Sequence, residues 1–395
     1  MIKEITDEYV ANTYNRYDVV LVRGNRATLY DENNNEYIDF GSGIGINALG
    51  VNNKKWQKAL ISQIFKIGHT SNLYYTQPQA ILAKKLCDLT GYKKVFYANS
   101  GAEANECAIK TARKYSIDKY GKNRYEIVSL IDSFHGRTIA TLSLTGQDKF
   151  HKDFNPFLDG FKYSIKNDFN NFLETISDKT CAVYLELIQG EGGVNVLEKD
   201  YVKRVYQYCN QNDILLIIDE VQTGNGRTGK LYAYENFDIK PDIVTTAKGL
   251  GNGLPISCVL FNDKAKNVLY PGSHGCTFGG NPIICEGAIL LLDTLTPNFL
   301  NNVIKKGNYI RSKLLKMNGV IDVSGMGLMI GVTINRNLDE FQKKCIKNGL
   351  LVLPAKGKIR LLPCLNISKK EIDKGLKIFE KTIKETGEKI NDKVF

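Results

Sequence analysis

Hydrophobic and polar positions follow two different rhythms between about residue 95 and residue 260. Short apolar runs, each about the length of a buried strand, alternate with longer segments whose apolar residues recur at helical spacing. The runs that we expect to be strands lie at residues 95–97, 126–130, 181–187, 214–218 and 243–246. This alternation predicts an α/β fold with a mostly parallel central sheet and helices on both faces. Ligands in such folds bind beyond the carboxyl ends of the strands.

The pattern changes at about residue 272, which indicates a second domain. A polar, glycine-rich loop over residues 273–282 is followed by a long helical segment and further helix–strand alternation. We expect an N-terminal arm and strands over residues 1–60 that join the small domain, a large domain over 61–272 and a C-terminal small α+β domain over 273–395. A chain of 395 residues with 43% hydrophobic residues can bury a core in each of two domains.

The net charge of +11 comes from the last quarter of the chain. Residues 301–395 hold 20 lysines and arginines against 9 acidic residues, and the first 300 residues are balanced. A basic face can attract nucleic acid. However, six lysines between residues 369 and 384 alternate with apolar residues at helical spacing, which is typical of a solvated helix face. We therefore expect no nucleic-acid partner.

The chain carries no signal for export, membrane insertion or metal binding. It has no N-terminal apolar segment of the signal-peptide type and no apolar run of bilayer-spanning length. Its nine cysteines are scattered and odd in number, without a CxxC pair, which favours reduced thiols over disulfides or a zinc site. Four histidines argue against a multi-histidine metal centre. We expect a cytoplasmic protein with no bound metal and no membrane contact.

Two predicted strands each deliver a reactive side chain to the crevice. The run 214–218 ends in Asp219, and the run 243–246 is followed by Lys248 within a glycine-rich turn. One known chemistry uses this pair: a lysine forms a Schiff base with an aldehyde cofactor, and a carboxylate keeps the ring nitrogen of that cofactor protonated.

A third strand end has the features of an anion site. The run 95–97 leads into Asn99-Ser-Gly-Ala-Glu-Ala-Asn105, and a long helix follows that we expect to end near Tyr115. Free backbone N–H groups and the positive end of the helix would point at one spot, and Ser100 adds a hydroxyl group. The same Ser-Gly pair also serves as an ordinary helix N-cap. Beside the lysine and the carboxylate, it indicates a phosphate cradle.

Other side chains near the strand ends become candidate site residues only because they lie near the predicted lysine, carboxylate and phosphate cradle. Phe134 can cover one face of a planar cofactor or simply fill the core. Arg137 can clamp a carboxylate or be a solvated arginine. Glu186 and Glu191 bracket the end of the run 181–187, where acidic residues also serve as surface or capping groups.

The ordered set of motifs resembles the class III pyridoxal-phosphate aminotransferases of fold type I, and most closely the acetylornithine aminotransferases. The resemblance extends from about residue 14 to about residue 367. The motifs that carry it are Ser71-Asn-Leu-Tyr-Tyr75, Asn99-Ser-Gly-Ala-Glu-Ala-Asn105, Gln189-Gly-Glu-Gly-Gly193, Asp219-Glu-Val-Gln-Thr-Gly224, Gly226-Arg-Thr-Gly229, Ala247-Lys-Gly249 and Thr277-Phe-Gly-Gly-Asn-Pro282.

The resemblance implies pyridoxal 5'-phosphate as the cofactor and a role for each matching residue. Lys248 would be the Schiff-base lysine and the base that moves the proton, and Asp219 would hold the pyridinium nitrogen. The other implied cofactor contacts are Gln222 to the ring hydroxyl, Val221 and Phe134 on the two ring faces, Ser100, Gly101 and Ala102 around the phosphate, and Thr277 reaching that phosphate from a partner subunit.

The resemblance also implies substrate contacts and an assembly. Arg137 would bind a substrate carboxylate, while Glu191 and Arg360 would form a gate in which the acid masks or releases the arginine. We add Tyr14, an aromatic residue of the N-terminal arm, to the substrate contacts. Because Thr277 would complete the phosphate site of a neighbour, the resemblance implies a homodimer with shared active sites. The partners are otherwise small molecules, namely an amino donor and 2-oxoglutarate.

The implied reaction is transamination of N2-acetylornithine with 2-oxoglutarate to N-acetylglutamate 5-semialdehyde and glutamate, as in arginine biosynthesis. Ornithine, succinylornithine, succinyldiaminopimelate and 4-aminobutyrate are alternative amino donors. Racemisation or decarboxylation with the same cofactor needs no acceptor with a second carboxylate, so the presence of both Arg137 and Arg360 favours transamination. A non-enzymatic binding module that uses the basic C-terminal face is the remaining alternative, and the intact Lys248 and Asp219 argue against it.

Overall fold

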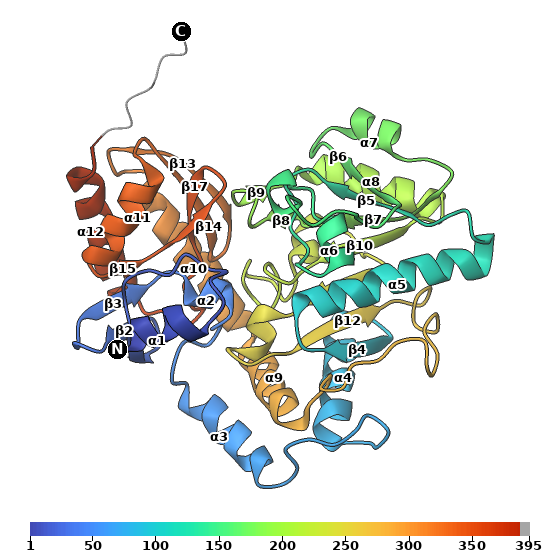
Figure 1. Ribbon diagram of the computed structural model, residues 1–395, viewed down its shortest axis with the longest axis horizontal. Helices are drawn as coiled ribbons and strands as arrows, with labels where there is room; N and C mark the ends of the chain where they lie inside the picture. The colour runs from blue at the N-terminus through green and yellow to red at the C-terminus, as the bar shows by residue number, and fades with distance from the viewer. Residues whose placement is uncertain (388–395) are drawn as a thin grey trace.

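A seven-stranded sheet forms the centre of the larger part of the molecule, and the computed structural model describes residues 1–387 of the chain (Figure 1). The strands, in spatial order, are β4 (Lys94–Ala98), β12 (Ser257–Phe261), β11 (Ile243–Thr246), β10 (Leu215–Asp219), β7 (Thr180–Leu185), β5 (Glu126–Leu130) and β6 (Phe161–Ser164). β12 runs antiparallel to both of its neighbours, and the other neighbouring pairs are parallel. The predicted, mostly parallel α/β sheet is thus confirmed.

Helices cover both faces of this sheet, as the apolar runs predict. On β10, Leu215 and Ile217 join the core on the side of α5 (Gly101–Tyr120), while Leu216 and Ile218 join the core on the side of α8 (Lys199–Gln211). A strand that buries both faces reads as a continuous apolar run. The other helices of this part are α4 (Gln77–Thr90), α6 (Ile139–Leu144) and α7 (Phe169–Thr175).

Helix α5 is longer than the sequence pattern predicts. It continues past Tyr115 to Tyr120 and ends at Gly121. Its last turn is held from outside, because the hydroxyl groups of Tyr115 and Tyr120 and the amine of Lys119 all bond the carboxylate of Asp213. The extra turn of the helix is therefore stabilised by contacts with Asp213. The spacing of apolar residues in the sequence does not show where the helix ends.

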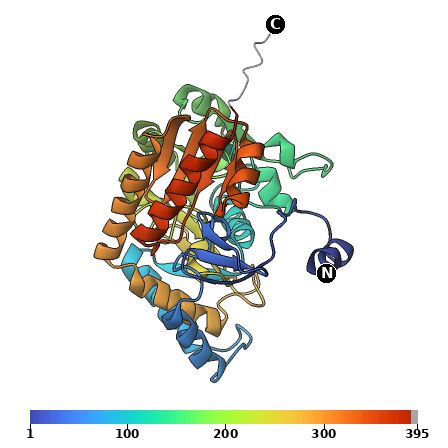
Figure 2. The ribbon, with the colours of Figure 1, turned by 90° about the vertical axis from the view of Figure 1, so that its left-hand side faces the viewer.

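The smaller part combines the two ends of the chain (Figure 2). One sheet contains β1 (Leu21–Asn25), β2 (Thr28–Asp31), β3 (Glu36–Asp39) and β15 (Leu350–Leu351), and the other contains β13 (Val320–Met326), β14 (Met329–Ile334), β17 (Lys358–Leu361) and β16 (Leu353–Ala355). The helices of this part are α10 (Pro297–Leu314), α11 (Leu338–Lys347) and α12 (Lys369–Glu385). β15 pairs in parallel with β3, so the N-terminal strands are tied to C-terminal ones.

Three further helices lie in the described part of the chain. α9 (Pro282–Thr294) packs against α3 (Lys54–Ile64) and α4. α1 (Ile2–Tyr9) stands away from the body in Figure 2 and buries none of its side chains. The division at residues 60 and 272 stays a prediction.

The basic C-terminal segment forms an amphipathic helix, as its spacing predicts. On α12, Ile372, Leu376, Phe379 and Ile383 are buried. Three of its lysines form ion pairs one turn away on the same helix, which is the usual state of a solvated face. Within residues 1–387, no single helix is long and apolar enough to cross a bilayer; α9 and α10 reach that length and hydropathy only together, and they are bent by 76°.

Candidate active site

A cavity of about 480 Å³ lies at the carboxyl ends of the parallel strands. The structure brings nine of the predicted site residues together in its lining: Ser100, Gly101, Ala102, Phe134, Arg137, Asp219, Val221, Gln222 and Lys248. These residues come from the ends of β4, β5, β10 and β11, which lie near one another in the sheet. Chain segments that are distant in sequence thus converge at one edge, as expected for a parallel sheet.

Asp219 is the last residue of β10, and several neighbouring groups hold its carboxylate in place. Oδ2 accepts a hydrogen bond of 2.9 Å from Nδ2 of Asn105 and lies 2.8 Å from Nδ1 of His135. Oδ1 accepts a 3.0 Å bond from the N–H of Val221. The side chain is only 4% exposed. With this many partners the carboxylate is fixed in direction, which suits a group that must stabilise a nearby cation.

The two donors behind Asp219 are themselves buried. Asn105 accepts a 2.7 Å hydrogen bond from the hydroxyl group of Tyr184, and this bond directs the amide nitrogen of Asn105 toward the carboxylate. The ring of His135 packs on Tyr184, and its Nε2 has no partner within residues 1–387. The sequence interpretation assigned neither Asn105 nor His135 a role. In the sequence, only their positions point to them: His135 directly follows Phe134, and Asn105 ends the motif that begins at Asn99.

Lys248 follows β11 and, among residues 1–387, is the only lysine that lines the cavity. It begins a short 3₁₀ turn in a left-handed conformation, with φ of 41°. Burial lowers the pKa of its amine, and the positive charge of Arg360 acts in the same direction. A lysine with a lowered pKa is more often a free amine at neutral pH, which is the form that attacks a carbonyl and accepts a proton.

The start of α5 has the features of an anion cradle. Ser100 caps the helix, and its side chain and that of Glu103 bond each other's backbone N–H groups in a capping box. The N–H groups of Gly101 and Ala102 donate to no atom of residues 1–387. Both point out of the positive end of a 20-residue helix that opens on the cavity. Free amides at a helix N-terminus are a general site for phosphate.

Val221 and Phe134 line the cavity, where they could pack against the faces of a flat ligand. A Cβ atom at Gly101 would lie 2.7 Å from Cγ1 of Val221. The absence of a side chain at Gly101 therefore leaves the space that Val221 occupies. Phe134 makes an edge contact with Phe150, with ring centroids 5.5 Å apart. Arg137 is exposed at the rim, and its guanidinium lies 4.2 Å from the centre of the Phe150 ring. An arginine held on an aromatic face keeps its donors free for a carboxylate.

Glu186, an acid at the edge of the crevice by sequence, turns out to be buried inside it. It lines the cavity at the end of β7 and accepts hydrogen bonds from the N–H of Phe134 at 2.9 Å and of Gly190 at 3.4 Å. Burial, together with the neighbouring charge of Asp219, raises its pKa well above the ordinary value. The position at the crevice end agrees with the sequence, the alternative of a surface acid does not hold for Glu186, and burial favours its protonated form.

The predicted gate residues form an ion pair across the two parts of the molecule. Arg360, on β17 of the small part, donates from Nη1 to Oε1 of Glu191 at 2.6 Å and to Oε1 of Gln222 at 3.0 Å. Burial by itself raises the pKa of Glu191, but the Arg360 guanidinium outweighs burial and holds the pKa below its ordinary value. Gln222 thus links the gate to the cavity lining.

Four predicted residues are absent from the lining of this cavity: the gate residues Glu191 and Arg360, and also Thr277 and Tyr14. Thr277 is exposed on the loop that precedes α9, and Tyr14 is 72% exposed on the N-terminal arm. Thr277 was predicted to act on a neighbouring subunit, so its position outside the cavity of its own chain leaves that prediction open. Nothing in the structure of the single chain brings Tyr14 to the cavity.

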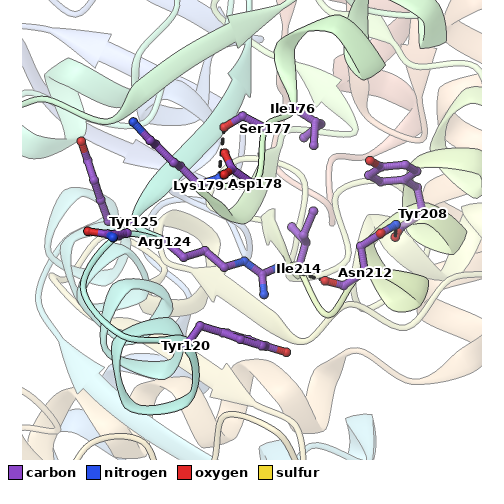
Figure 3. Close-up of a pocket in the computed structure, with 11 residues that line it drawn as sticks. Tyr120, Arg124, Tyr125, Ile176, Ser177, Asp178, Lys179, Tyr208, Asn212 and Ile214 are labelled. Carbon is purple, nitrogen blue, oxygen red and sulfur yellow. Dashed lines mark hydrogen bonds between the residues drawn. The ribbon is translucent and has the colours of Figure 1, made fainter.

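A second cavity, of about 950 Å³, lies at the opposite ends of the strands (Figure 3). Its central side chain, Arg124, is bound to backbone carbonyl groups: Nε donates to Thr180 at 2.8 Å and Nη2 to Asn212 at 2.9 Å. Arg124 therefore joins the ends of neighbouring segments. Within residues 1–387, no three His, Cys, Asp or Glu side chains are arranged to hold a metal ion. The smaller cavity is the candidate active site.

Comparison with known proteins supports this assignment. The sequence model described as aminotransferase class-III matches residues 9–383. The acetylornithine aminotransferase of Haemophilus ducreyi is 49% identical over 387 residues, which cover 97% of this chain and 98% of that protein.

Solved structures agree with the sequence matches. The N-acetylornithine aminotransferase of Stenotrophomonas maltophilia K279a superposes with a TM-score of 0.84 at 33% identity, over 97% of this chain and 98% of that one. An ornithine aminotransferase of Toxoplasma gondii, which holds PLP at partial occupancy in its active site, superposes with a TM-score of 0.92 at 30% identity, over 97% and 93% of the two chains.

Proposed function

The chain belongs to the class-III aminotransferase family, and we propose that it transfers the δ-amino group of N2-acetylornithine to 2-oxoglutarate. The products are N-acetylglutamate 5-semialdehyde and glutamate, and the reaction is a step of arginine biosynthesis. The proposal rests on one observation in particular, the ion pair of Arg360 with Glu191 at the cavity.

The residues of the cavity fit pyridoxal 5'-phosphate, on which this family depends. The free amides of Gly101 and Ala102 suit its phosphate, and the carboxylate of Asp219 suits its ring nitrogen. The amine of Lys248 suits its aldehyde. When bound, the cofactor supplies an electron sink for the negative charge left on a substrate carbon after a proton is removed.

The chain's own residues supply the proton transfer. Nζ of Lys248, whose pKa is lowered by burial, takes the proton from the substrate carbon that carries the amino group. Asn105 and His135 contact one oxygen of Asp219 and hold the carboxylate in place. Because the Asp219 side chain is buried, its field acts with little screening.

The gate explains how one site accepts two different substrates. In N2-acetylornithine the reacting δ-carbon is a CH₂ group, with no carboxylate beside it. Arg360 is then covered by Glu191, as in this structure, and the distant carboxylate is bound by Arg137 at the rim. In 2-oxoglutarate the reacting carbon carries a carboxylate. Glu191 must then leave Arg360 free for that group, while Arg137 binds the second carboxylate.

The other amino donors that remain are ornithine, succinylornithine, succinyldiaminopimelate and 4-aminobutyrate. Ornithine, succinylornithine and 4-aminobutyrate also present a CH₂ group to the reacting position, so the closed gate accepts them. The reacting carbon of succinyldiaminopimelate carries a carboxylate, so this donor needs Arg360 uncovered, as 2-oxoglutarate does. The similarity to proteins named acetylornithine aminotransferase favours N2-acetylornithine.

We also propose a cytoplasmic homodimer. The loop with Thr277 and the segment 71–75 lie together, because Nδ2 of Asn72 donates to the carbonyl groups of Cys276 and Gly279 at 3.1 and 2.9 Å. Large apolar side chains of this surface are exposed to solvent: Leu73, Tyr74, Tyr75 and Phe278. A second subunit that buries them would place Thr277 near the neighbour's phosphate cradle. All nine cysteines lie within the described residues and are free thiols, which suits a reducing compartment.

The test is a half-reaction without acceptor. The holoenzyme is mixed separately with N2-acetylornithine and each of the four alternative donors, and loss of the visible absorbance band of the bound cofactor is followed. The fastest conversion is expected with N2-acetylornithine. Faster conversion by another amine would change the substrate and keep the chemistry, whereas a protein without a cofactor band after incubation with PLP would refute the proposal.

A further inference from the structure

The turn between β16 and β17 contacts the large part of the molecule through Lys356. Its Nζ lies 2.5 Å from Oδ1 of Asp132, which follows β5 of the large sheet. The other oxygen, Oδ2, is 3.3 Å from Nζ of Lys166, a residue of the large part itself. Asp132 is therefore shared between an ion pair that crosses the two parts and one that does not.

We propose that Lys356 and Asp132 form a latch between the two parts that positions Arg360 for substrates with a carboxylate beside the reacting carbon. This inference rests on the proposed function, because it assigns Arg360 to the dicarboxylate. Lys356 and Asp132 are positioning residues, and neither lines the cavity.

The backbone of the turn strengthens the latch. The N–H of Lys356 donates to the carbonyl oxygen of Glu191 at 3.4 Å. A Cβ atom at Gly193 would lie 2.7 Å from the carbonyl oxygen of Lys356, so the turn packs directly on this loop. On the large side, a Cβ atom at Gly192 would lie 2.7 Å from the carbonyl oxygen of Asp132. The loop 190–193 is thus enclosed between the two partners of the ion pair.

The latch matters when the gate opens. With the gate closed, Arg360 is tied to the large part by the side chains of Glu191 and Gln222. When Glu191 turns away, the shorter of these two contacts is lost. The contacts of Lys356 use the carboxylate of Asp132 and the backbone of Glu191, and neither depends on the side chain of Glu191. β17, which carries Arg360, therefore keeps its position after the gate opens and before a substrate carboxylate binds to Arg360.

The electrostatics of Asp132 agree with this role. Burial by itself raises its pKa, but Lys356 and Lys166 outweigh burial and hold the pKa below its ordinary value. The Asp132 side chain is 16% exposed and that of Lys356 is 58% exposed. For a partly exposed pair we expect an effect of about two- to fivefold on the function that it supports.

The test compares two neutral variants of the holoenzyme. Lys356→Gln removes the pair that crosses the two parts, and Lys166→Gln removes the matched pair within the large part. Each is assayed at steady state with an acceptor present, once with glutamate and once with N2-acetylornithine as the amino donor. For Lys356→Gln we expect KM for glutamate to rise about two- to fivefold, with kcat and the KM for N2-acetylornithine unchanged. Lys166→Gln should match the wild type with both donors.

A second variant and a second measurement remove the dependence on turnover. Asp132 has φ of 69°, a left-handed conformation that asparagine tolerates, so Asp132→Asn keeps the backbone and removes the charge. In hydrogen exchange, the amides of residues 353–361 should exchange faster in Lys356→Gln and Asp132→Asn than in the wild type and in Lys166→Gln.

The outcomes separate the latch from the proposed function. A wild-type enzyme that does not react with N2-acetylornithine refutes the function, while the exchange data still test the latch. The latch is overturned if exchange in residues 353–361 is the same in all four proteins. It is also overturned if Lys356→Gln changes KM for both donors equally, or if Lys166→Gln has the same effect as Lys356→Gln.

Discussion

His135 Nδ1 lies 2.8 Å from Oδ2 of Asp219, and both side chains are almost completely buried. Nδ2 of Asn105 contacts the same oxygen, and both Asn105 and His135 are buried and border the cavity. These buried partners fix the direction in which Asp219 presents its carboxylate, and with it the position of its negative charge.

The first prediction concerns that charge. In Asp219→Asn the neutral amide cannot stabilise a ring cation, so we expect kcat to fall by roughly 10²- to 10³-fold, the usual cost of losing one electrostatic stabiliser in a buried site. PLP should stay bound, because Lys248 and the cradle at Gly101 are unchanged. Half-reaction rates and the ratio of PLP to protein measure the two effects. A variant with near-normal kcat would contradict the role of Asp219.

Much of the fold and the cofactor site is predictable from the sequence. The apolar run before Asp219 and the short run before Lys248 mark buried strands, and parallel strands necessarily bring their ends to one edge. The Ser-Gly pair after β4 is likewise local, because a helix N-cap and an anion site share the same residues.

Contacts that depend on the relative position of distant segments are not predictable in this way. Lys356 and Asp132 lie 224 positions apart, and no spacing rule joins them. The burial of Glu186 depends on how the loop after β7 folds back, and the sequence shows only an acid at a strand end. The partner of Asn105 could not be inferred either, because it lies on β10 and not on α5 itself.

The second prediction concerns the space around the cradle. In Gly101→Ala, the new Cβ atom would lie 2.7 Å from Cγ1 of Val221, so Val221 must move toward the place of the cofactor ring. We expect PLP to dissociate about tenfold more readily, since a strained contact of this kind costs roughly 1–3 kcal/mol. Titration of the apoenzyme with PLP gives the Kd.

Gly387→Ala is the matched control for that substitution. A Cβ atom at Gly387 meets nothing within 4 Å, and the residue is exposed. Its Kd for PLP should equal that of the wild type. An unchanged Kd in Gly101→Ala would mean that Val221 does not wall the cofactor.

The third prediction concerns the gate. Glu191→Gln keeps the shape of the side chain but removes the charge that covers Arg360. The exposed cation should then favour glutamate, so we expect KM for glutamate to fall and kcat/KM for N2-acetylornithine to fall by about tenfold or more, since hydrogen bonds to charged groups contribute roughly 1.5–3 kcal/mol. Parallel half-reactions with the two donors measure this. Equal changes for both donors would argue against a gate.

The fourth prediction concerns Glu220, the residue after Asp219, which points away from the cavity. It is fully buried, with Oε1 accepting from the N–H of Tyr234 at 2.9 Å and Oε2 from the hydroxyl group of Thr223 at 2.5 Å. Burial raises its pKa from 4.5 to about 7. The folded protein therefore binds more protons at this site than the unfolded chain does between these two pH values. By linkage, the free energy of unfolding falls as pH rises from about 4.5 to about 7.

Glu220→Gln should remove this slope, because the amide carries no charge at any pH in the range and its oxygen can still accept from Tyr234. The full contribution is about 3 kcal/mol, given about 1.4 kcal/mol for each pH unit of the shift. Denaturant unfolding at pH 5, 6, 7 and 8 and at one protein concentration measures the difference between variant and wild type. Glu380→Gln, on the exposed face of α12, should leave the wild-type slope intact. If Glu220→Gln keeps that slope as well, Glu220 is ionised throughout and burial does not govern its proton.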